Sequence, residues 1–172
     1  VQNATLKVKR GVSISLKQEG ILCLIEKLKQ VFGNDFVALA LFGSLARGEV
    51  EEAGDIDLFC IIDNLPDSAY RKTKLLHQIA VQCIKRRLSI IAKTRKEFIS
   101  HFSSLYLDLG LDAIIIYDSD DFLAQKLQRI RQIIEEAGLK REQIGKDFYW
   151  DWDVSPKARW EITWDGYHEL AG

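Results

Sequence analysis

A Gly-Ser pair and two aspartates in the first third of the sequence are suited to binding phosphate and a divalent metal. Gly43 and Ser44 follow a short apolar run, and Asp55 and Asp57 open a second apolar run. Glycine allows a sharp turn, and Ser44 is predicted to be the N-cap of a helix over Leu45-Ala46-Arg47. The free backbone N–H groups at a helix start bind phosphate oxygens. Carboxylates are preferred ligands of Mg²⁺. The pattern therefore predicts a phosphate cradle that faces a metal site.

The alternation of side chains along a strand supports this interpretation. Asp55 and Asp57 fall on one face of the predicted strand, and Ile56 and Leu58 fall on the other. Two carboxylates about 6 Å apart repel by roughly 3 kcal/mol at an effective dielectric near 20. Mg²⁺ bridging to a nucleoside triphosphate compensates such a pair. Asp-x-Asp alone is common at solvated strand starts, but its position after a strand–Gly–Ser turn favours the functional interpretation.

The second part of the cradle is a basic side chain. Arg47 comes one turn after Ser44 and is predicted to form a charge-assisted contact with the same phosphates.

The apolar pattern elsewhere predicts strands that alternate with helices, which indicates α/β or α+β packing. Thr94-x-x-Glu97 is a capping box at the start of one helix, and Gly138 ends another. The predicted strands are 36–42, 55–62, 88–92 and 113–117, and the predicted helices are 15–32, 66–87, 95–102 and one that carries Leu123 to Ala137.

The stretch LFGSLARGEVEEAGDIDLFCIID resembles the GS-x10-D-x-D signature of the minimal nucleotidyltransferases of the DNA polymerase β superfamily. The resemblance covers roughly residues 36–118 and implies a mixed β-sheet flanked by helices. It implies that Gly43 and Ser44 hold the β- and γ-phosphates, and that Asp55 and Asp57 bind the catalytic metals. Arg47 matches a basic position that is frequent in the family's GS-x-A-R-G stretch.

One position departs from the family pattern. The family usually has a third carboxylate on the next core strand, where this sequence has Ser89. Asp108 and Asp112 are alternative sources of the missing acid.

Two functions therefore stay open. The first is a Mg²⁺-dependent nucleotidyltransferase that moves a nucleoside monophosphate, with AMP from ATP favoured, to a hydroxyl of a protein or small molecule. The alternative is a catalytically weak or inactive nucleotide-binding, antitoxin-like protein-interaction module on the same fold. Many minimal family members resemble antitoxins that adenylylate a helical partner.

The composition limits the other classes of partner. The net charge of −1 provides no basic field for nucleic acid, so no nucleic-acid partner is expected. We expect Cys23, Cys60 and Cys83 to be reduced core thiols, because they are odd in number and lie in apolar stretches. No signal peptide is expected, and no apolar run in the sequence approaches the roughly 20 residues that span a bilayer. A cytoplasmic protein without a membrane partner is the expectation.

The C-terminal end is rich in aromatic residues. Its last 23 residues contain Trp150, Trp152, Trp160 and Trp164. We divide the chain into a nucleotidyltransferase-like domain, residues 1–145, and a short aromatic extension, residues 146–172. Large aromatic side chains need burial, so the extension is expected to fold back over the domain. The alternative is that it forms an interface with a helical protein partner or a second copy of the chain.

Overall fold

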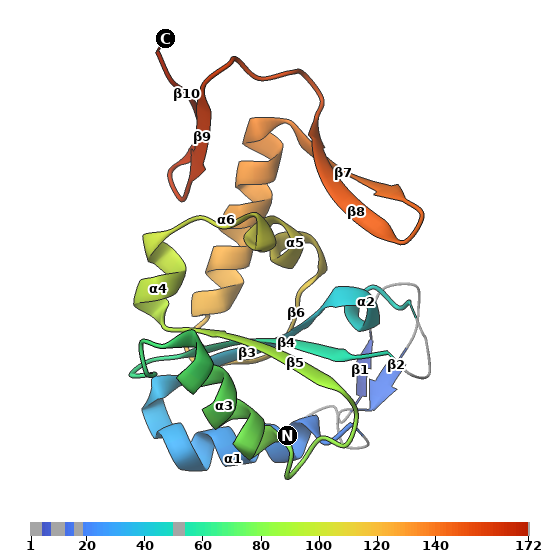
Figure 1. Ribbon diagram of the computed structural model, residues 1–172, viewed down its shortest axis with the longest axis vertical. Helices are drawn as coiled ribbons and strands as arrows, with labels where there is room; N and C mark the ends of the chain where they lie inside the picture. The colour runs from blue at the N-terminus through green and yellow to red at the C-terminus, as the bar shows by residue number, and fades with distance from the viewer. Residues whose placement is uncertain (1–4, 8–12, 16–18, 50–53, 172) are drawn as a thin grey trace.

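A computed structural model describes residues 5–7, 13–15, 19–49 and 54–171 of the chain. Its centre is a four-stranded mixed sheet in the order β5-β4-β3-β6 (Figure 1). β4 runs antiparallel to β3 and parallel to β5, and β6 runs antiparallel to β3. The four strands are β3 Phe36–Phe42, β4 Ile56–Ile62, β5 Leu88–Lys93 and β6 Ile114–Asp118. The predicted mixed sheet flanked by helices is confirmed.

Helices cover both faces of the sheet (Figure 1). One face carries α1 Ile21–Phe32 and α3 Ala69–Ala80. The opposite face carries α4 Arg95–Ser100, α5 Ser104–Asp112 and α6 Phe122–Ala137. Each face has its own hydrophobic cluster. Because both faces are covered, β3 and β4 are apolar along nearly their whole length, and Asp57 is the polar exception on β4.

The alternation of β4 decides which layer the aspartate faces. Ile56 and Leu58 belong to the cluster under α1 and α3, whereas Phe59 and Ile61 belong to the cluster under α5 and α6. Asp57 therefore lies on the same face of the sheet as α5 and α6.

Local sequence signals set several helix ends. Thr94 and Glu97 form the predicted capping box at the start of α4, and Gly138 ends α6 in the left-handed conformation. α3, however, ends at Ala80 rather than near residue 87. The chain turns over residues 81–87 and enters β5 alongside the start of β4, with Leu88 opposite Ile56. A longer helix would leave no chain for this turn.

The cysteines correct another expectation. Cys23 on α1 and Cys83 after α3 form a disulfide across a Cα–Cα distance of 5.6 Å, so these two are not reduced thiols. They lie 60 residues apart in sequence, and only the packing of α1 beside the end of α3 brings them together. Cys60 is free and buried, as predicted.

The C-terminal part forms two β-hairpins. β7 Leu139–Ile144 pairs with β8 Asp147–Trp152, and β9 Trp160–Thr163 pairs with β10 Gly166–Glu169. The division placed at residue 145 falls in the turn between β7 and β8. In Figure 1, the first hairpin runs from the end of α6 toward the short helix α2, Gly43–Ala46.

The tryptophans of this part divide into two groups. Trp164 packs against Phe98, Phe102 and Tyr106 of the domain and donates its indole N–H to the Phe98 carbonyl at 3.1 Å. Trp152 instead contacts Trp160 and Tyr167 within the extension.

At the other end of the chain, β1 Thr5–Lys7 pairs with β2 Ser13–Ser15. Among the helices described, none has the length and apolar character needed to cross a membrane.

Candidate functional site

The predicted turn lies where β3 ends. Phe42, the last residue of β3, pairs in register with Asp57, and the chain then turns at Gly43, whose φ is +72°. A Cβ atom at position 43 would lie 2.3 Å from Oδ2 of Asp57. Glycine is therefore required both by the backbone conformation and by the approach of the carboxylate.

Ser44 has a different place from the one predicted. It lies inside α2, whose N-cap is Phe42, and no side chain caps this helix. The prediction that Ser44 is the N-cap is wrong, because the helical turn already begins at Gly43. Ser44 remains beside Gly43 on the turn that faces Asp57.

Asp57 lies in β4 on the face that is not packed against α1, and Asp55 comes directly before this strand. Ile56 and Leu58 are fully buried, while Asp55 and Asp57 are partly exposed. Burial raises the pKa of Asp57, the negative charge of Asp55 raises it further, and Arg47 opposes both. Asp55 contacts Arg87 at 3.4 Å between Oδ1 and Nε, but this arginine is 84% exposed.

These residues fit a magnesium ion. Mg²⁺ usually binds through one or two carboxylates, completes its shell with water and takes further oxygens from substrate phosphates. Asp55 and Asp57 repel each other and offer such oxygens. In the part of the chain that the structure describes, no group of three or more His, Cys, Asp or Glu residues could hold a metal ion.

The neighbouring strand provides a hydroxyl at this position. Ser89 of β5 pairs with Asp57 in the parallel register, so both side chains lie on the same face of the sheet. The residue beside the candidate metal pair is therefore a serine.

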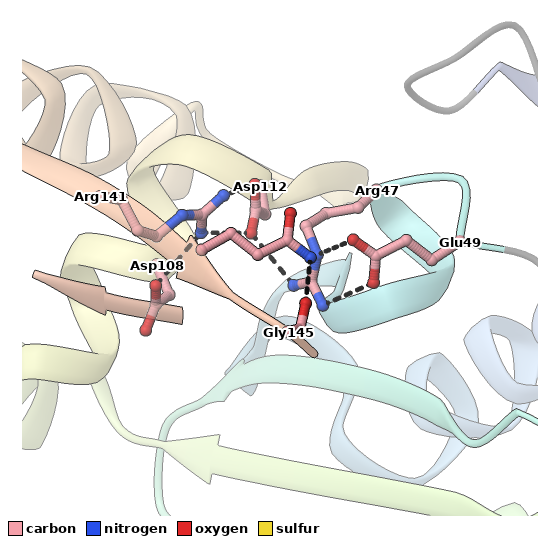
Figure 2. A network of polar contacts seen from close by, with 7 residues as sticks. Arg47, Glu49, Asp108, Asp112, Arg141 and Gly145 are labelled. Atoms are coloured by element: carbon pink, nitrogen blue, oxygen red, sulfur yellow. Dashed lines mark hydrogen bonds and ion pairs between the residues drawn. The ribbon is translucent and has the colours of Figure 1, made fainter. Parts of the chain in front are cut away.

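Arg47 is held by carboxylates on two sides (Figure 2). Its Nε and Nη2 donate to Glu49 at 2.9 and 3.0 Å, and its Nη1 donates to Asp112 at 3.3 Å. Burial lowers the pKa of Arg47, but the hydrogen bonds and charges of Glu49 and Asp112 raise it by more. The arginine therefore stays charged close to Asp57.

Asp112 connects this arginine to the C-terminal hairpin. Its side chain is 2% exposed, and Arg141 of β7 donates to both of its oxygens at 2.6 and 2.9 Å. Figure 2 shows Asp112 between the two guanidinium groups. A carboxylate buried this deeply and shared by two arginines is a poor candidate for the missing catalytic acid.

Asp108 is more accessible. It accepts hydrogen bonds at Oδ1 from Arg141 and from the indole of Trp150, both at 3.2 Å. It also lines a cavity of about 160 Å³ beside the Gly43 turn, together with Phe42, Gly43, Arg47, Leu105, Asp112 and Phe148.

Phe148 closes the C-terminal side of this cavity. The guanidinium carbons of Arg47 and Arg141 each lie 4.6 Å from the centre of its ring. Sequence reasoning missed Arg141 and Phe148, and it did not foresee the contact between Arg47 and Asp112. Their separation along the chain left no local pattern, although the DFYWDWD aromatic run marked this region as unusual.

Comparison with known proteins identifies the family. The family model of the nucleotidyltransferase domain matches residues 24–161. The chain belongs to this family. The match is longer than the resemblance seen in the sequence, which covers residues 36–118, and it includes the β7–β8 hairpin.

A relative from Methanocaldococcus jannaschii, named "Putative protein adenylyltransferase", is 36% identical over 115 residues, which cover 64% of this chain and 78% of that protein. Among solved structures, a spectinomycin adenyltransferase from Enterococcus faecialis with ATP and spectinomycin has a TM-score of 0.51 at 13% identity, covering 70% of this chain and 66% of that one. At this identity the likeness concerns the fold alone. A complex of a tri-AMPylated Shewanella oneidensis HEPN toxin with an MNT antitoxin matches with a TM-score of 0.45 at 12% identity, over 69% and 87% of the chains.

Proposed function

We propose that this protein is a Mg²⁺-dependent adenylyltransferase that transfers AMP from ATP to a hydroxyl group of an acceptor. A protein acceptor is favoured over a small molecule, because the M. jannaschii relative is named as a protein adenylyltransferase. The observation that carries the proposal is the contact between the Gly43 turn and the Asp57 carboxylate, where only a glycine fits. A triphosphate on the turn would lie next to the carboxylate pair.

Different residues of this site bind the phosphates and the metal. The backbone N–H groups around Gly43 and Ser44 bind the terminal phosphates, and Arg47 adds positive charge. Asp55 and Asp57 hold the metal. When bound, Mg²⁺ neutralises the triphosphate and polarises the phosphorus under attack. The acceptor hydroxyl loses its proton to solvent and its oxygen forms a bond to the α-phosphorus, while the bond from this phosphorus to the oxygen shared with the β-phosphate breaks and pyrophosphate leaves.

Calorimetric titration with ATP tests the site directly. The wild-type protein is expected to bind ATP with Mg²⁺ and to lose at least about tenfold in affinity without it. Asp57→Asn is expected to lose the metal dependence. Asp67→Asn is the matched control, because Asp67 is exposed and lies after the opposite end of β4. Absence of nucleotide binding by the wild type would refute the proposal.

Transfer is then measured with isotopically labelled ATP and a lysate that contains acceptors. A label on the α-phosphate should become covalently attached to protein, and a label on the γ-phosphate should not. Attachment of both labels would contradict adenylyl transfer.

A second candidate function is a nucleotide-binding, antitoxin-like interaction module with weak or no catalysis. The register that puts Ser89 beside Asp57 favours it, because a neutral serine hydroxyl is a poor proton acceptor. Ser89→Asp separates the two candidates. A variant that gains transfer over an inactive wild type supports the module, whereas a wild type that already transfers AMP supports the enzyme.

A further inference from the structure

The C-terminal hairpin reaches the nucleotide site through one aromatic ring. Phe148 of β8 contacts Arg47, which follows the Gly43 turn, and the guanidinium carbon lies 4.6 Å from the ring centre. These two residues lie about a hundred positions apart in the sequence. The family model includes the hairpin, but neither the proposed chemistry nor the motif assigns a role to this residue.

Arg47 has donors left after its protein contacts. A guanidinium group carries five N–H donors, and three are used on Glu49 and Asp112. One N–H on each terminal nitrogen has no described acceptor. The charge of Arg47 also acts on Asp57, so the guanidinium lies near the aspartate pair.

The Phe148 ring limits the movement of the guanidinium group that carries those two donors. Three hydrogen bonds to Glu49 and Asp112 hold the edges of the planar guanidinium group, and its central carbon lies over the Phe148 ring. The guanidinium carbon of Arg141 lies at the same distance from the ring centre, and Arg141 is fixed by both oxygens of the buried Asp112. The ring and the two carboxylates therefore restrict the guanidinium group of Arg47 together.

We propose that Phe148 is a positioning residue for the triphosphate. It holds Arg47 with two N–H groups directed to the phosphates, so the β7–β8 hairpin contributes to phosphate binding. This inference rests on the proposed function and adds that the phosphate contact depends on an aromatic ring at position 148.

The test compares Phe148→Leu with Phe148→Tyr. Leucine keeps an apolar side chain but removes the aromatic face, whereas tyrosine keeps the face. We expect the leucine variant to bind Mg²⁺-ATP about tenfold more weakly and the tyrosine variant to bind within about twofold of the wild type. Tyr149→Ala is the matched control, because this neighbouring aromatic side chain points to the opposite face of β8, and it should leave the affinity unchanged.

Inorganic tripolyphosphate with Mg²⁺ is the second probe. If Phe148 acts through the phosphates, Phe148→Leu weakens the binding of tripolyphosphate and of ATP by the same factor. A loss confined to ATP would mean that the ring contacts the nucleoside, and it would overturn the proposal. Equal affinity of Phe148→Leu and the wild type for both probes would also overturn it.

Thermal unfolding of each variant, without ligand, separates positioning from stability. A purely structural role predicts a lower Tm with unchanged affinity of the folded protein, which would refute the inference. A wild type that binds neither probe would refute the proposed function instead, so the two failures are distinguishable. If Phe148→Leu does not fold, Phe148→Met takes its place, because methionine also keeps an apolar side chain without an aromatic face. This variant should then weaken both probes equally.

Discussion

Two networks of charged side chains lie at opposite ends of the strands of the central sheet, and they differ in burial. At the edge where β3 ends, Asp112 is 2% exposed and joins Arg47 to Arg141. At the edge where β4 ends, Arg95 joins Asp63 to Asp120, which is 50% exposed. Removing one member of a buried charge network leaves its partners uncompensated, whereas an exposed pair contributes little.

The comparison shows why cavity size is a poor guide to the site. The edge with the exposed network has the larger cavity, of about 630 Å³, lined by residues that include Asp35, Asp63 and Glu97. The cavity beside Gly43 is about 160 Å³. The smaller cavity adjoins the required glycine, the aspartate pair and the buried network, and these features indicate function more strongly than volume does.

The largest predicted effect is that of Asp112→Ala. We expect it to lower the free energy of unfolding by roughly 3–5 kcal/mol, because two largely buried arginines lose their shared carboxylate. Asp120→Ala, at the exposed network, should cost less than about 1 kcal/mol. Urea denaturation of both variants measures the difference. Equal costs would show that the two networks are energetically alike.

The second prediction compares glycines at the two ends of β3. Gly43→Ala and Gly33→Ala both put an alanine at positive φ, with native values of +72° and +53°, and each should cost roughly 1–3 kcal/mol. Only the Cβ at position 43 meets a neighbour, Oδ2 of Asp57 at 2.3 Å; nothing lies within 4 Å of the one at position 33. Gly43→Ala should therefore also lose at least about tenfold in Mg²⁺-ATP affinity. Calorimetry checks this loss, and similar affinity in both variants would contradict the cradle.

The third prediction concerns the pH dependence of Asp57. Burial and the charge of Asp55 raise its folded pKa above the ordinary 3.8, so the folded state binds more protons and stability falls as pH rises through that window. Without metal, Asp57→Asn should be more stable than the wild type at pH 7, by less than about 1 kcal/mol because the site is solvated. The difference should shrink toward pH 4. Thermal unfolding across pH measures it, and a less stable variant at pH 7 would contradict the prediction.

The fourth prediction has the opposite sign and concerns Glu97 at the other edge. Burial raises its pKa, but the ammonium of Lys72 and the backbone N–H of Thr94 lower it by more, to below the ordinary 4.5. The ionised Glu97 side chain therefore stabilises the folded protein above pH 4.5, and this stabilisation is lost as the pH falls through the pKa of Glu97 in the folded state. Glu97→Gln should be less stable at neutral pH by about 1 kcal/mol or less. Its unfolding curves should approach those of the wild type in acid; a constant difference would exclude titration of Glu97 as the cause.

Contacts between neighbours in the sequence were predictable. The strand before Gly43, the alternation at Asp55 and Asp57 and the capping box at Thr94 depend on residues a few positions apart. The Cys23–Cys83 disulfide and the Arg47–Asp112 contact depend on packing between distant elements, so no local pattern encodes them. The sequence does not predict α5, because its apolar residues do not follow one clear face. It does not predict the C-terminal hairpins either, because their strands are only four to six residues long and lack a clear alternation of apolar and polar residues.

The disulfide has a consequence for proteolysis. The loop that it closes, between Cys23 and Cys83, contains both the Gly43 turn and the aspartate pair. A protease that cuts the chain anywhere in this loop therefore leaves the two fragments covalently joined. The two fragments of such a chain would separate on a denaturing gel only after the disulfide is reduced with a thiol. Gels run with and without the thiol therefore show whether a cut lies inside the loop or outside it.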